Sequence, residues 1–311
     1  MRKEHTLLNE KYRPRNLSTF LAEDNFKIKF QEFIDKNDIP HLLFAGEPGS
    51  GKSTLAKILV NNINCDYIYL NATENRGMDD IKEKVGSFAS AASFKPLKIV
   101  ILDEATHILQ ASQVLLLNMI ETYSLTTRFI LTGNYPERLI PPLRSRLQEF
   151  KLTPPSKKVV AKHVVGILET ENIEFEIEDI VKIIQNSYPD FRKVINTCQK
   201  YIVDNKLVLP GILVSNNDFN KQIIDELKKP SNKTFNAIRQ IIANNNISSF
   251  DDVYKYLYDN TSEYAIGCEG VIAIILNEHI YQSNFKIDLE INFCAAVSRI
   301  IETLKTNKKL I

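Results

Sequence analysis

Residues 41–57, HLLFAGEPGSGKSTLAK, contain the clearest indication of the fold of this chain. This stretch begins as an apolar run typical of a buried strand, passes through a glycine-rich loop and continues as a helical pattern. The loop, Gly46-Glu47-Pro48-Gly49-Ser50-Gly51-Lys52-Ser53, satisfies G-x-x-x-x-G-K-[ST] between a strand and a helix, as a phosphate-binding loop requires. Glycines let backbone N–H groups turn inward around phosphate oxygens, and the helix N-terminus adds a favourable dipole. The sequence therefore predicts that these residues bind a nucleotide.

The side chains at the end of this loop have separate expected roles. Lys52 places a mobile positive charge near the β- and γ-phosphates, whereas the Ser53 hydroxyl is a ligand for Mg²⁺. Thr54 follows directly and completes the expected nucleotide-binding set. ATP and Mg²⁺ are the cofactors that this arrangement implies.

Polar side chains follow the next two apolar runs, residues 98–102 and 129–133. Asp103 is expected to bind the magnesium shell, and Glu104 to orient and help deprotonate a water that attacks the γ-phosphate. Asn134 is expected to read the γ-phosphate or to hold that water. Taken alone, two acidic residues after a strand are more often a turn or a helix cap, and Gly-Asn is an ordinary turn pair. Their combination with the phosphate-binding loop favours a catalytic site.

Short β-rich apolar runs alternate with helical patterns up to residue 152. The runs are HLLFAG, YIYLN, KIVILD, RFILTGN and LQEFKL. This alternation predicts a parallel sheet covered by helices, and the almost uniformly apolar third and fourth runs are typical of interior strands. We therefore expect residues 1–152 to form an α/β domain.

Helical spacing of apolar residues replaces this pattern after the break Thr153-Pro154-Pro155. Three stretches carry it: residues 157–173, 176–188 and 189–205. We expect a small all-helical domain over residues 153–216 and, after the break LPGILVSNND, a third, helical domain over residues 217–311. In the third, AIGCEGVIAIILNEHI is apolar around most of its circumference, which predicts burial between helices of its own domain or of a neighbour.

The composition limits the classes of protein to consider. Thirty-nine basic and thirty-eight acidic side chains nearly cancel, so affinity for nucleic acid would require a local basic face. The four cysteines lie far apart, and we interpret them as reduced thiols of the core. No stretch approaches the roughly twenty apolar residues that cross a bilayer. We expect a soluble, cytoplasmic protein with no membrane partner.

Four further motifs resemble those of the AAA+ ATPases, and more narrowly of sliding-clamp loaders of the replication factor C type. Glu10-Lys11-Tyr12-Arg13-Pro14 resembles the box that opens their small subunits, and Asn71–Gly77 resembles their N-A-S-x-x-R-G stretch. Asn134-Tyr135-Pro136 resembles the sensor-1 strand, and Ile140–Arg146 ends in a sequence similar to the Ser-Arg-Cys arginine-finger motif. The resemblance covers the first two expected domains and implies an AAA+ domain, a helical lid and a C-terminal helical collar.

Two segments, Ser87–Phe94 and Pro189–Lys193, resemble still more closely the large clamp-loader subunit of T-even-type bacteriophages. This resemblance implies a viral origin, with the host cytoplasm as the location.

The resemblance also implies roles for four residues. Tyr12 and Arg13 would lie beside the nucleotide, and Arg192 would be the sensor-2 arginine that reaches it from the lid. Arg146 would act in trans, as a permanently charged donor to the γ-phosphate of a neighbouring subunit. The alternative for both arginines is an ordinary solvated surface charge.

The chain departs from the family pattern at three positions. Leu147 replaces the cysteine of Ser-Arg-Cys, which leaves the arginine intact. Leu117 and Asn118 stand where related chains often carry two arginines, so a contact between subunits is expected to be missing or supplied elsewhere.

The function that the resemblance implies is that of an ATPase subunit of a sliding-clamp loader. It would use ATP binding and hydrolysis at intersubunit sites to open the clamp and load it onto primer–template DNA. The expected partners are the clamp, the DNA, further copies of the chain and a companion subunit. Two alternatives remain open: another AAA+ DNA-remodelling ATPase, for branch migration or replication restart, and a structural ATP-binding subunit.

Two pairs of residues are candidates for contacts with these partners. Arg76 and Lys82 begin a helical stretch and are candidates for DNA binding, with a solvated helix face as the alternative. Phe88 and Phe94 bracket small residues and are candidate anchors for a pocket on the clamp, with core packing as the alternative.

Overall fold

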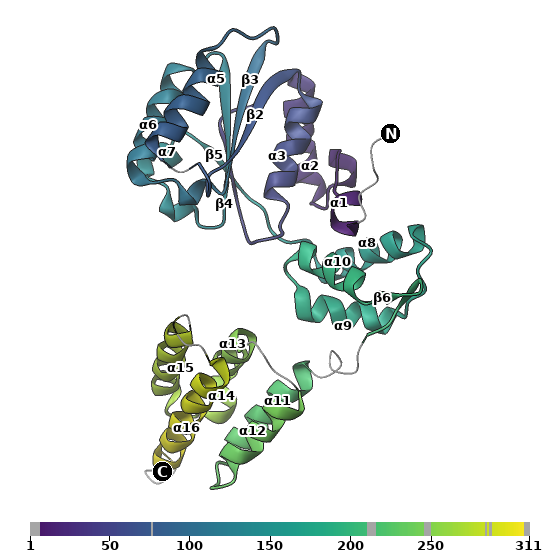
Figure 1. Ribbon diagram of the computed structural model, residues 1–311, viewed down its shortest axis with the longest axis vertical. Coiled ribbons are helices and arrows are strands. Elements are labelled where there is room, and N and C mark those ends of the chain that lie inside the picture. The colour runs from purple at the N-terminus through teal and green to yellow at the C-terminus, as the bar shows by residue number, and fades with distance from the viewer. Residues whose placement is uncertain are drawn as a thin grey trace. The chain divides into compact units, whose positions relative to one another are not determined.

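The computed structural model describes residues 7–75, 77–209, 216–245, 250–283, 285 and 288–307. The chain forms two compact units, one up to Val208 and one from Leu209 onward. Figure 1 shows the main sheet of the first unit and the helices of the second.

A five-stranded parallel sheet is the centre of the first unit. Its strands are β1 (Leu42–Ala45), β2 (Cys65–Asn71), β3 (Leu97–Asp103), β4 (Thr127–Gly133) and β5 (Gln148–Lys151). The strand order is β2-β3-β4-β1-β5, and every neighbouring pair is parallel. The predicted parallel sheet is confirmed. Because β3 and β4 are interior strands, their residues are nearly all buried.

Helices cover both faces of this sheet (Figure 1). The covering helices and turns are α2 (Asp24–Lys36), α3 (Lys52–Asn62), α4 (Met78–Asp80), the π-helical turn η2 (Ile81–Val85), α5 (Gly86–Ser90), α6 (Gln110–Thr122) and α7 (Pro141–Arg144). One core packs α2 and α3 on Phe44 and Ile101, and the other packs η2 and α6 on Val100 and Leu131. Parallel strands therefore bury both faces, as the apolar runs predicted.

Three helices follow the sheet within the same unit: α8 (Lys157–Thr170), α9 (Ile177–Ser187) and α10 (Phe191–Lys200). Ser156 caps α8 by accepting from the Val159 N–H, and Asp190 caps α10 by accepting from the Lys193 N–H. The short helix α1 (Leu8–Lys11) packs on this group through Leu8.

The predicted helix over residues 189–205 is wrong at its end. It stops at Lys200, and β6 (Ile202–Val203) pairs antiparallel with β7 (Lys206–Leu207). The two residues between these strands, Asp204 and Asn205, have φ of 49° and 58°. Asp and Asn tolerate this left-handed conformation, which a tight hairpin requires and a helix does not allow.

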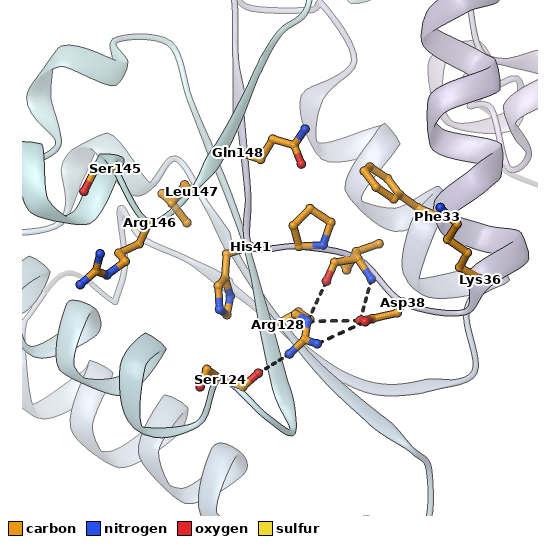
Figure 2. A pocket seen from close by; sticks show the side chains of 12 residues that line it. Phe33, Lys36, Asp38, His41, Ser124, Arg128, Ser145, Arg146, Leu147 and Gln148 are labelled. Atoms are coloured by element: carbon orange, nitrogen blue, oxygen red, sulfur yellow. Dashed lines mark hydrogen bonds and ion pairs between the residues drawn. The ribbon is translucent and has the colours of Figure 1, made fainter.

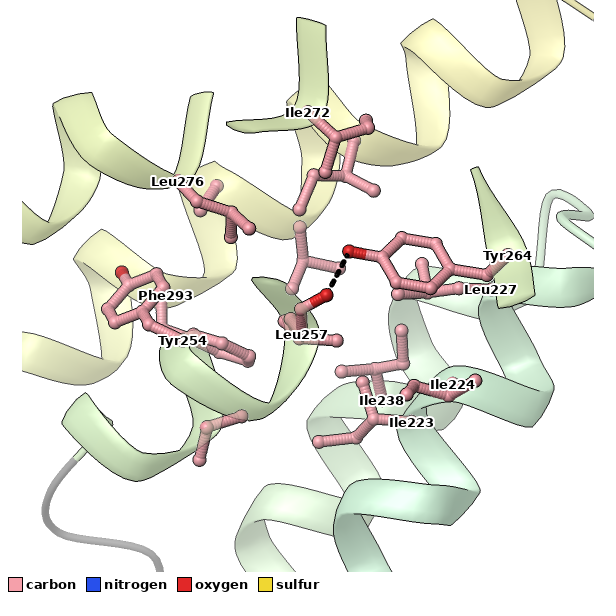
Figure 3. Packing of buried hydrophobic residues seen from close by; sticks show 14 of the residues in the cluster. Ile223, Ile224, Leu227, Ile238, Tyr254, Leu257, Tyr264, Ile272, Leu276 and Phe293 are labelled. Carbon is pink, nitrogen blue, oxygen red and sulfur yellow. Dashed lines mark hydrogen bonds between the residues drawn. The ribbon is translucent and has the colours of Figure 1, made fainter. Parts of the chain in front are cut away.

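The second unit is helical in its described part. Its helices are α11 (Asn216–Lys228), α12 (Thr234–Asn244), α13 (Asp251–Asp259), α14 (Thr261–Tyr264), α15 (Glu269–Ser283) and α16 (Leu289–Asn307). Figure 3 shows side chains of several of these helices meeting in one apolar core, with Tyr264 donating to the Leu257 carbonyl at 3.0 Å. Gly267, with φ of 84°, lies in the break between α14 and α15.

The apolar helix α15 is buried on one face only within its own unit. Ile272, Ile275 and Leu276 are buried, whereas Val271 and Ile274 are about half exposed. The burial expected for residues 265–280 is therefore only partly met inside the unit.

Three of the four cysteines are buried, Cys294 is half-buried, and all four are free thiols. Among the described helices, none is both long enough and apolar enough to cross a bilayer.

Candidate functional site

One cavity in the first unit brings most of the predicted nucleotide-binding residues together. It lies at the carboxyl ends of the central strands, where ligands bind in open parallel sheets. Its lining comes mainly from four parts of the chain: the N-terminal segment, the loop after β1, the turn after β3 and helix α10. Its lining includes Tyr12, Arg13, Pro48, Gly49, Ser50, Gly51, Lys52, Ser53, Thr54, Glu104 and Arg192. Gly46 and Glu47 begin the same loop, and both bind Lys52 through their carbonyl groups.

The loop needs glycine at two positions for different reasons. Gly49 has φ of 76°, and a Cβ there would lie 2.1 Å from the Asp190 carboxylate at the start of α10. Gly51 has φ of 95°, and a Cβ there would lie 2.8 Å from the Phe20 ring. Both the left-handed backbone and the close approach of neighbouring groups therefore exclude a side chain.

Lys52 is the first residue of α3 and is buried. Its ammonium group donates to the Gly46 carbonyl at 3.0 Å, the Glu47 carbonyl at 2.9 Å and the Asn134 Oδ1 at 2.7 Å. Burial lowers the pKa of Lys52, and the carboxylates of Glu104 and Asp103 act in the opposite direction. The structure thus joins the loop lysine to the polar residue that ends β4.

Asp103 accepts hydrogen bonds from three hydroxyl groups. Ser53 Oγ donates to its Oδ1 at 2.7 Å, Thr132 donates to the same oxygen, and Tyr69 donates to Oδ2. Burial acts to raise the pKa of Asp103, but these hydrogen bonds outweigh it and hold the pKa below its ordinary value. Asp103 is therefore a charged carboxylate beside Ser53, the pair expected to take part in binding Mg²⁺.

Glu104 has an unusual backbone and an unpartnered carboxylate oxygen. Its φ is 55°, and its N–H donates to Thr132 Oγ1 at 3.1 Å. Its Oε2 is buried and, among the described residues, has no hydrogen-bond partner. A buried acceptor that no protein group satisfies is suited to a water or ligand in the cavity. The predicted role of Glu104 requires an oxygen that is available in this way.

The N-terminal segment joins the loop to the three helices after the sheet. Arg13 donates from Nε to Thr54 Oγ1 at 3.1 Å, and the Tyr12 hydroxyl donates to Glu171 at the end of α8. Burial raises the pKa of Tyr12, and so does the neighbouring carboxylate of Glu171. Arg192 is exposed at the first turn of α10 and lines the same cavity. Each of the three predicted residues therefore lies near the loop.

These residues fit a nucleotide with Mg²⁺. In the described part of the chain no group of three or more His, Cys, Asp or Glu side chains gathers as a self-sufficient metal site. Mg²⁺ is usually held by one or two carboxylates together with substrate phosphates, so Asp103 and Ser53 are an adequate protein contribution. The hydroxyl of Ser50 is buried without a partner among the described residues, and such a group is suited to a hydrogen bond with a phosphate oxygen.

Arg146 lies at the other edge of the sheet. Figure 2 shows it near His41, Arg128 and Gln148. These residues line an open cleft of about 700 Å³ beside the amino ends of β1, β4 and β5. Its guanidinium donates to Glu121 at 2.8 Å, and its side chain is 56% exposed. Arg128 is fixed there by Ile39, Asp38 and Ser124. Because β1 leads away from this cleft to the phosphate-binding loop, Arg146 lies at the opposite end of β1 from that loop.

The three residues that depart from the family pattern differ in how deeply they are buried. Leu147 is buried in the core that contains α6, where an apolar side chain packs as a cysteine would. Leu117 packs partly against the same core, whereas Asn118 is exposed.

The candidate partner-binding residues are less closely grouped. Lys82 is exposed on η2, and Arg76 lies outside the described residues. Phe88 is half-buried against the core that contains α6, while Phe94 is fully exposed.

Tyr69 and Thr132 also donate hydrogen bonds to Asp103, and neither was among the predicted site residues. Tyr69 is on β2, two residues before Asn71, which is in register with Asp103. Thr132 interrupts the apolar run of β4 one residue before its end. A polar residue near the carboxyl end of a buried strand was the available signal for Thr132.

Known proteins are similar to this chain in sequence. The family model described as "ATPase family associated with various cellular activities (AAA)" matches residues 42–155. Replication factor C small subunit of Sulfolobus acidocaldarius is 30% identical over 96% of both chains. The same-named protein of Aeropyrum pernix is 39% identical over 61% of each chain.

A solved structure shares the fold. The Thermotoga maritima RuvB Holliday junction branch migration motor aligns with 80% of this chain and 91% of its own, at a TM-score of 0.55 and 19% identity. Identity this low shows the fold alone. The family is shown by the AAA match and by relatives that are similar over almost the whole chain, and the phosphate-binding loop is consistent with it. The chain therefore belongs to the replication factor C small-subunit family and is an AAA ATPase subunit of a clamp loader.

Proposed function

We propose that this subunit binds ATP and Mg²⁺ at sites shared between neighbouring subunits, and uses them to open a sliding clamp and load it onto primer–template DNA. The observation that carries the proposal is the separation of Arg146 from the nucleotide cavity of its own chain. Lys52 and Glu104 line this cavity, and Asp103 accepts a hydrogen bond from Ser53 of the same lining. Arg146 is exposed at the amino ends of the strands. A permanently charged side chain so placed is suited to a neighbour's γ-phosphate.

Three parts of the chain would share this work. Residues 1–152 would bind the nucleotide, residues 153–216 would close over it as a lid, and residues 217–311 would assemble the subunits as a collar. The exposed apolar face of α15, with Val271, Ile274 and Tyr281 about half exposed or more, supports a collar contact with another subunit. The assembly would contain several copies of this chain and a companion subunit.

The finer assignment, to the type found in T-even bacteriophages, rests on the segments Ser87–Phe94 and Pro189–Lys193. With it, the host cytoplasm is the proposed location.

DNA would be held by its phosphate backbone, with Arg76 and Lys82 as the proposed contacts. Such contacts give affinity without reading bases and weaken with salt. We expect primer–template DNA and clamp together to stimulate ATP turnover by the assembled complex, and the Arg76→Ala, Lys82→Ala double variant to lose most of the DNA-dependent part. Steady-state ATPase assays with and without each component measure this. If the double variant keeps full stimulation by DNA, Arg76 and Lys82 are not the DNA contacts. If neither DNA nor clamp changes the rate of ATP turnover, the chain is better described as a self-contained ATPase.

Phe94 is the side chain that we propose to anchor this subunit in a pocket of the clamp. Its ring is fully exposed, so its removal costs no packing within the subunit. Because one buried aromatic anchor often contributes about 2 kcal/mol or more, Phe94→Ala is expected to weaken clamp binding by at least about thirtyfold, as measured by surface plasmon resonance. Leu125→Ala, which removes another highly exposed apolar side chain, is the matched control. Equal loss in both variants would mean that exposure rather than position matters.

A further inference from the structure

We propose that Lys98 is a positioning residue that holds the loop of residues 91–96 rigid, so that Phe94 meets its partner in a fixed orientation. This inference rests on the proposed function, in which Phe94 enters a pocket on the clamp. It adds a residue that never touches the clamp and acts through the backbone behind the anchor.

Lys98 is a buried cation on β3, with only 6% of its surface exposed. Its ammonium group donates to the carbonyl groups of Phe88 at 3.3 Å, Ala89, and Ala91 at 2.7 Å. An ammonium has three donors, and these three bonds account for all of them. Lys98 therefore connects an interior strand to the end of α5.

The carbonyl groups that Lys98 binds belong to the end of α5 and the residue after it. The last four carbonyls of a helix lack partners within the helix, and a positive charge there is favourable. α5 continues directly from η2, whose Ile81 and Val85 are fully buried, and of its own side chains Ala89 is buried. Packing therefore anchors the helix before α5, and the bonds from Lys98 satisfy carbonyl groups at the end of α5, where the loop to Phe94 begins.

A second set of contacts fixes the other end of the loop. Ser93 Oγ donates to the Asp66 carboxylate at 2.7 Å, and the Lys95 N–H donates to Ser93 Oγ at 3.0 Å. Lys95 Nζ donates to the Cys65 carbonyl at 2.7 Å. Cys65 and Asp66 begin β2, so the loop is held by the two adjacent strands β2 and β3 on both sides of Phe94.

The consequence is an exposed aromatic ring on a backbone that is ordered before any partner arrives. Binding then loses less conformational entropy, because the loop does not have to be fixed at that moment.

The chain contains no tryptophan, so Phe94→Trp gives a fluorescent probe at the anchor alone. In this background we compare Lys98→Met, which has no donor, with Lys98→Gln, which keeps an amide donor, and with Lys29→Met, which removes an exposed lysine of α2. Time-resolved anisotropy reports the local motion of the ring, and titration with the clamp reports affinity. Thermal denaturation monitored by circular dichroism shows whether each variant is folded.

We expect Lys98→Met to increase the amplitude of nanosecond motion at position 94 and to weaken clamp binding several-fold, up to about tenfold. Lys98→Gln should lie between Lys98→Met and the parent, and Lys29→Met should match the parent. If Lys98→Met does not fold, the Lys98→Gln result decides. Unchanged motion in a folded Lys98 variant would overturn the proposal, and so would greater motion without a loss of affinity while Phe94→Ala binds weakly. If Phe94→Ala binds the clamp normally, Phe94 is not the anchor and the proposed function fails at this point. The anisotropy then tests separately whether Lys98 restricts the motion of the loop.

Discussion

Glu104→Gln is expected to lower ATP turnover by a factor of about a hundred to ten thousand while leaving ATP binding intact. Glutamine has the shape of glutamate but cannot accept a proton from water. The Glu104 Oε2 has no hydrogen-bond partner among the described residues, so the substitution breaks no bond that holds the site together. Lys52 and Asp103 keep their own contacts. The nucleotide should therefore bind and remain uncleaved.

Two measurements on the assembled complex test this result. Single-turnover hydrolysis gives the chemical step, and equilibrium titration with a fluorescent ATP analogue gives binding. Glu137→Gln, which changes an exposed carboxylate of the turn Pro136–Arg138, is the control and should behave as wild type. Turnover retained in Glu104→Gln would remove the general-base role and leave the structural ATP-binding subunit as the better description.

Arg146→Ala is expected to lower turnover in the assembled, DNA- and clamp-stimulated complex by a factor of about a thousand, and to leave the isolated chain almost unchanged. The difference arises because Arg146 lies at the amino ends of the strands, away from the cavity of its own chain. Its only described ion pair, with Glu121, is exposed and contributes little to stability. The fold should therefore survive the substitution.

The matched control is Arg144→Ala, which removes another exposed arginine that pairs with Glu149. A mixing experiment adds a direct test of action in trans. Arg146→Ala and Glu104→Gln chains, each nearly inactive, should regain part of the turnover when assembled together, because some interfaces then join an intact Glu104 to an intact Arg146. Equal loss in the isolated chain and in the complex would place Arg146 in its own site, and no recovery on mixing would contradict a shared site.

The sequence could predict those parts of the fold that depend on local pattern. The phosphate-binding loop and the interior strands have short-range signals, since a buried parallel strand is an apolar run and the loop has a fixed spacing. The hairpin after α10 was missed because Ile202 and Val203 continue the helical spacing of apolar residues. Only the left-handed pair Asp204 and Asn205 marked the turn.

The rest of the site depends on contacts between distant parts of the chain. Tyr69 reaches Asp103 because β2 and β3 pair in one particular register, and a shift of one residue would turn Tyr69 to the other face. Tyr12 and Glu171 are 159 residues apart and meet only because α1 packs beside the helices that follow the sheet. No periodicity within a single segment contains that information.

The two ends of strand β3 lie next to different proposed sites. Its first residues follow the loop that carries Phe94, and its last residue is Asp103. Seven extended residues span about 20 Å, and β2 and β4 bond to this strand along both sides. Such a strand resists bending and stretching, so under the proposed function a force applied at the end near Phe94 would displace Asp103 as part of one rigid body. Movement of the clamp and the alignment of the attacking water would then both depend on the position of this one strand.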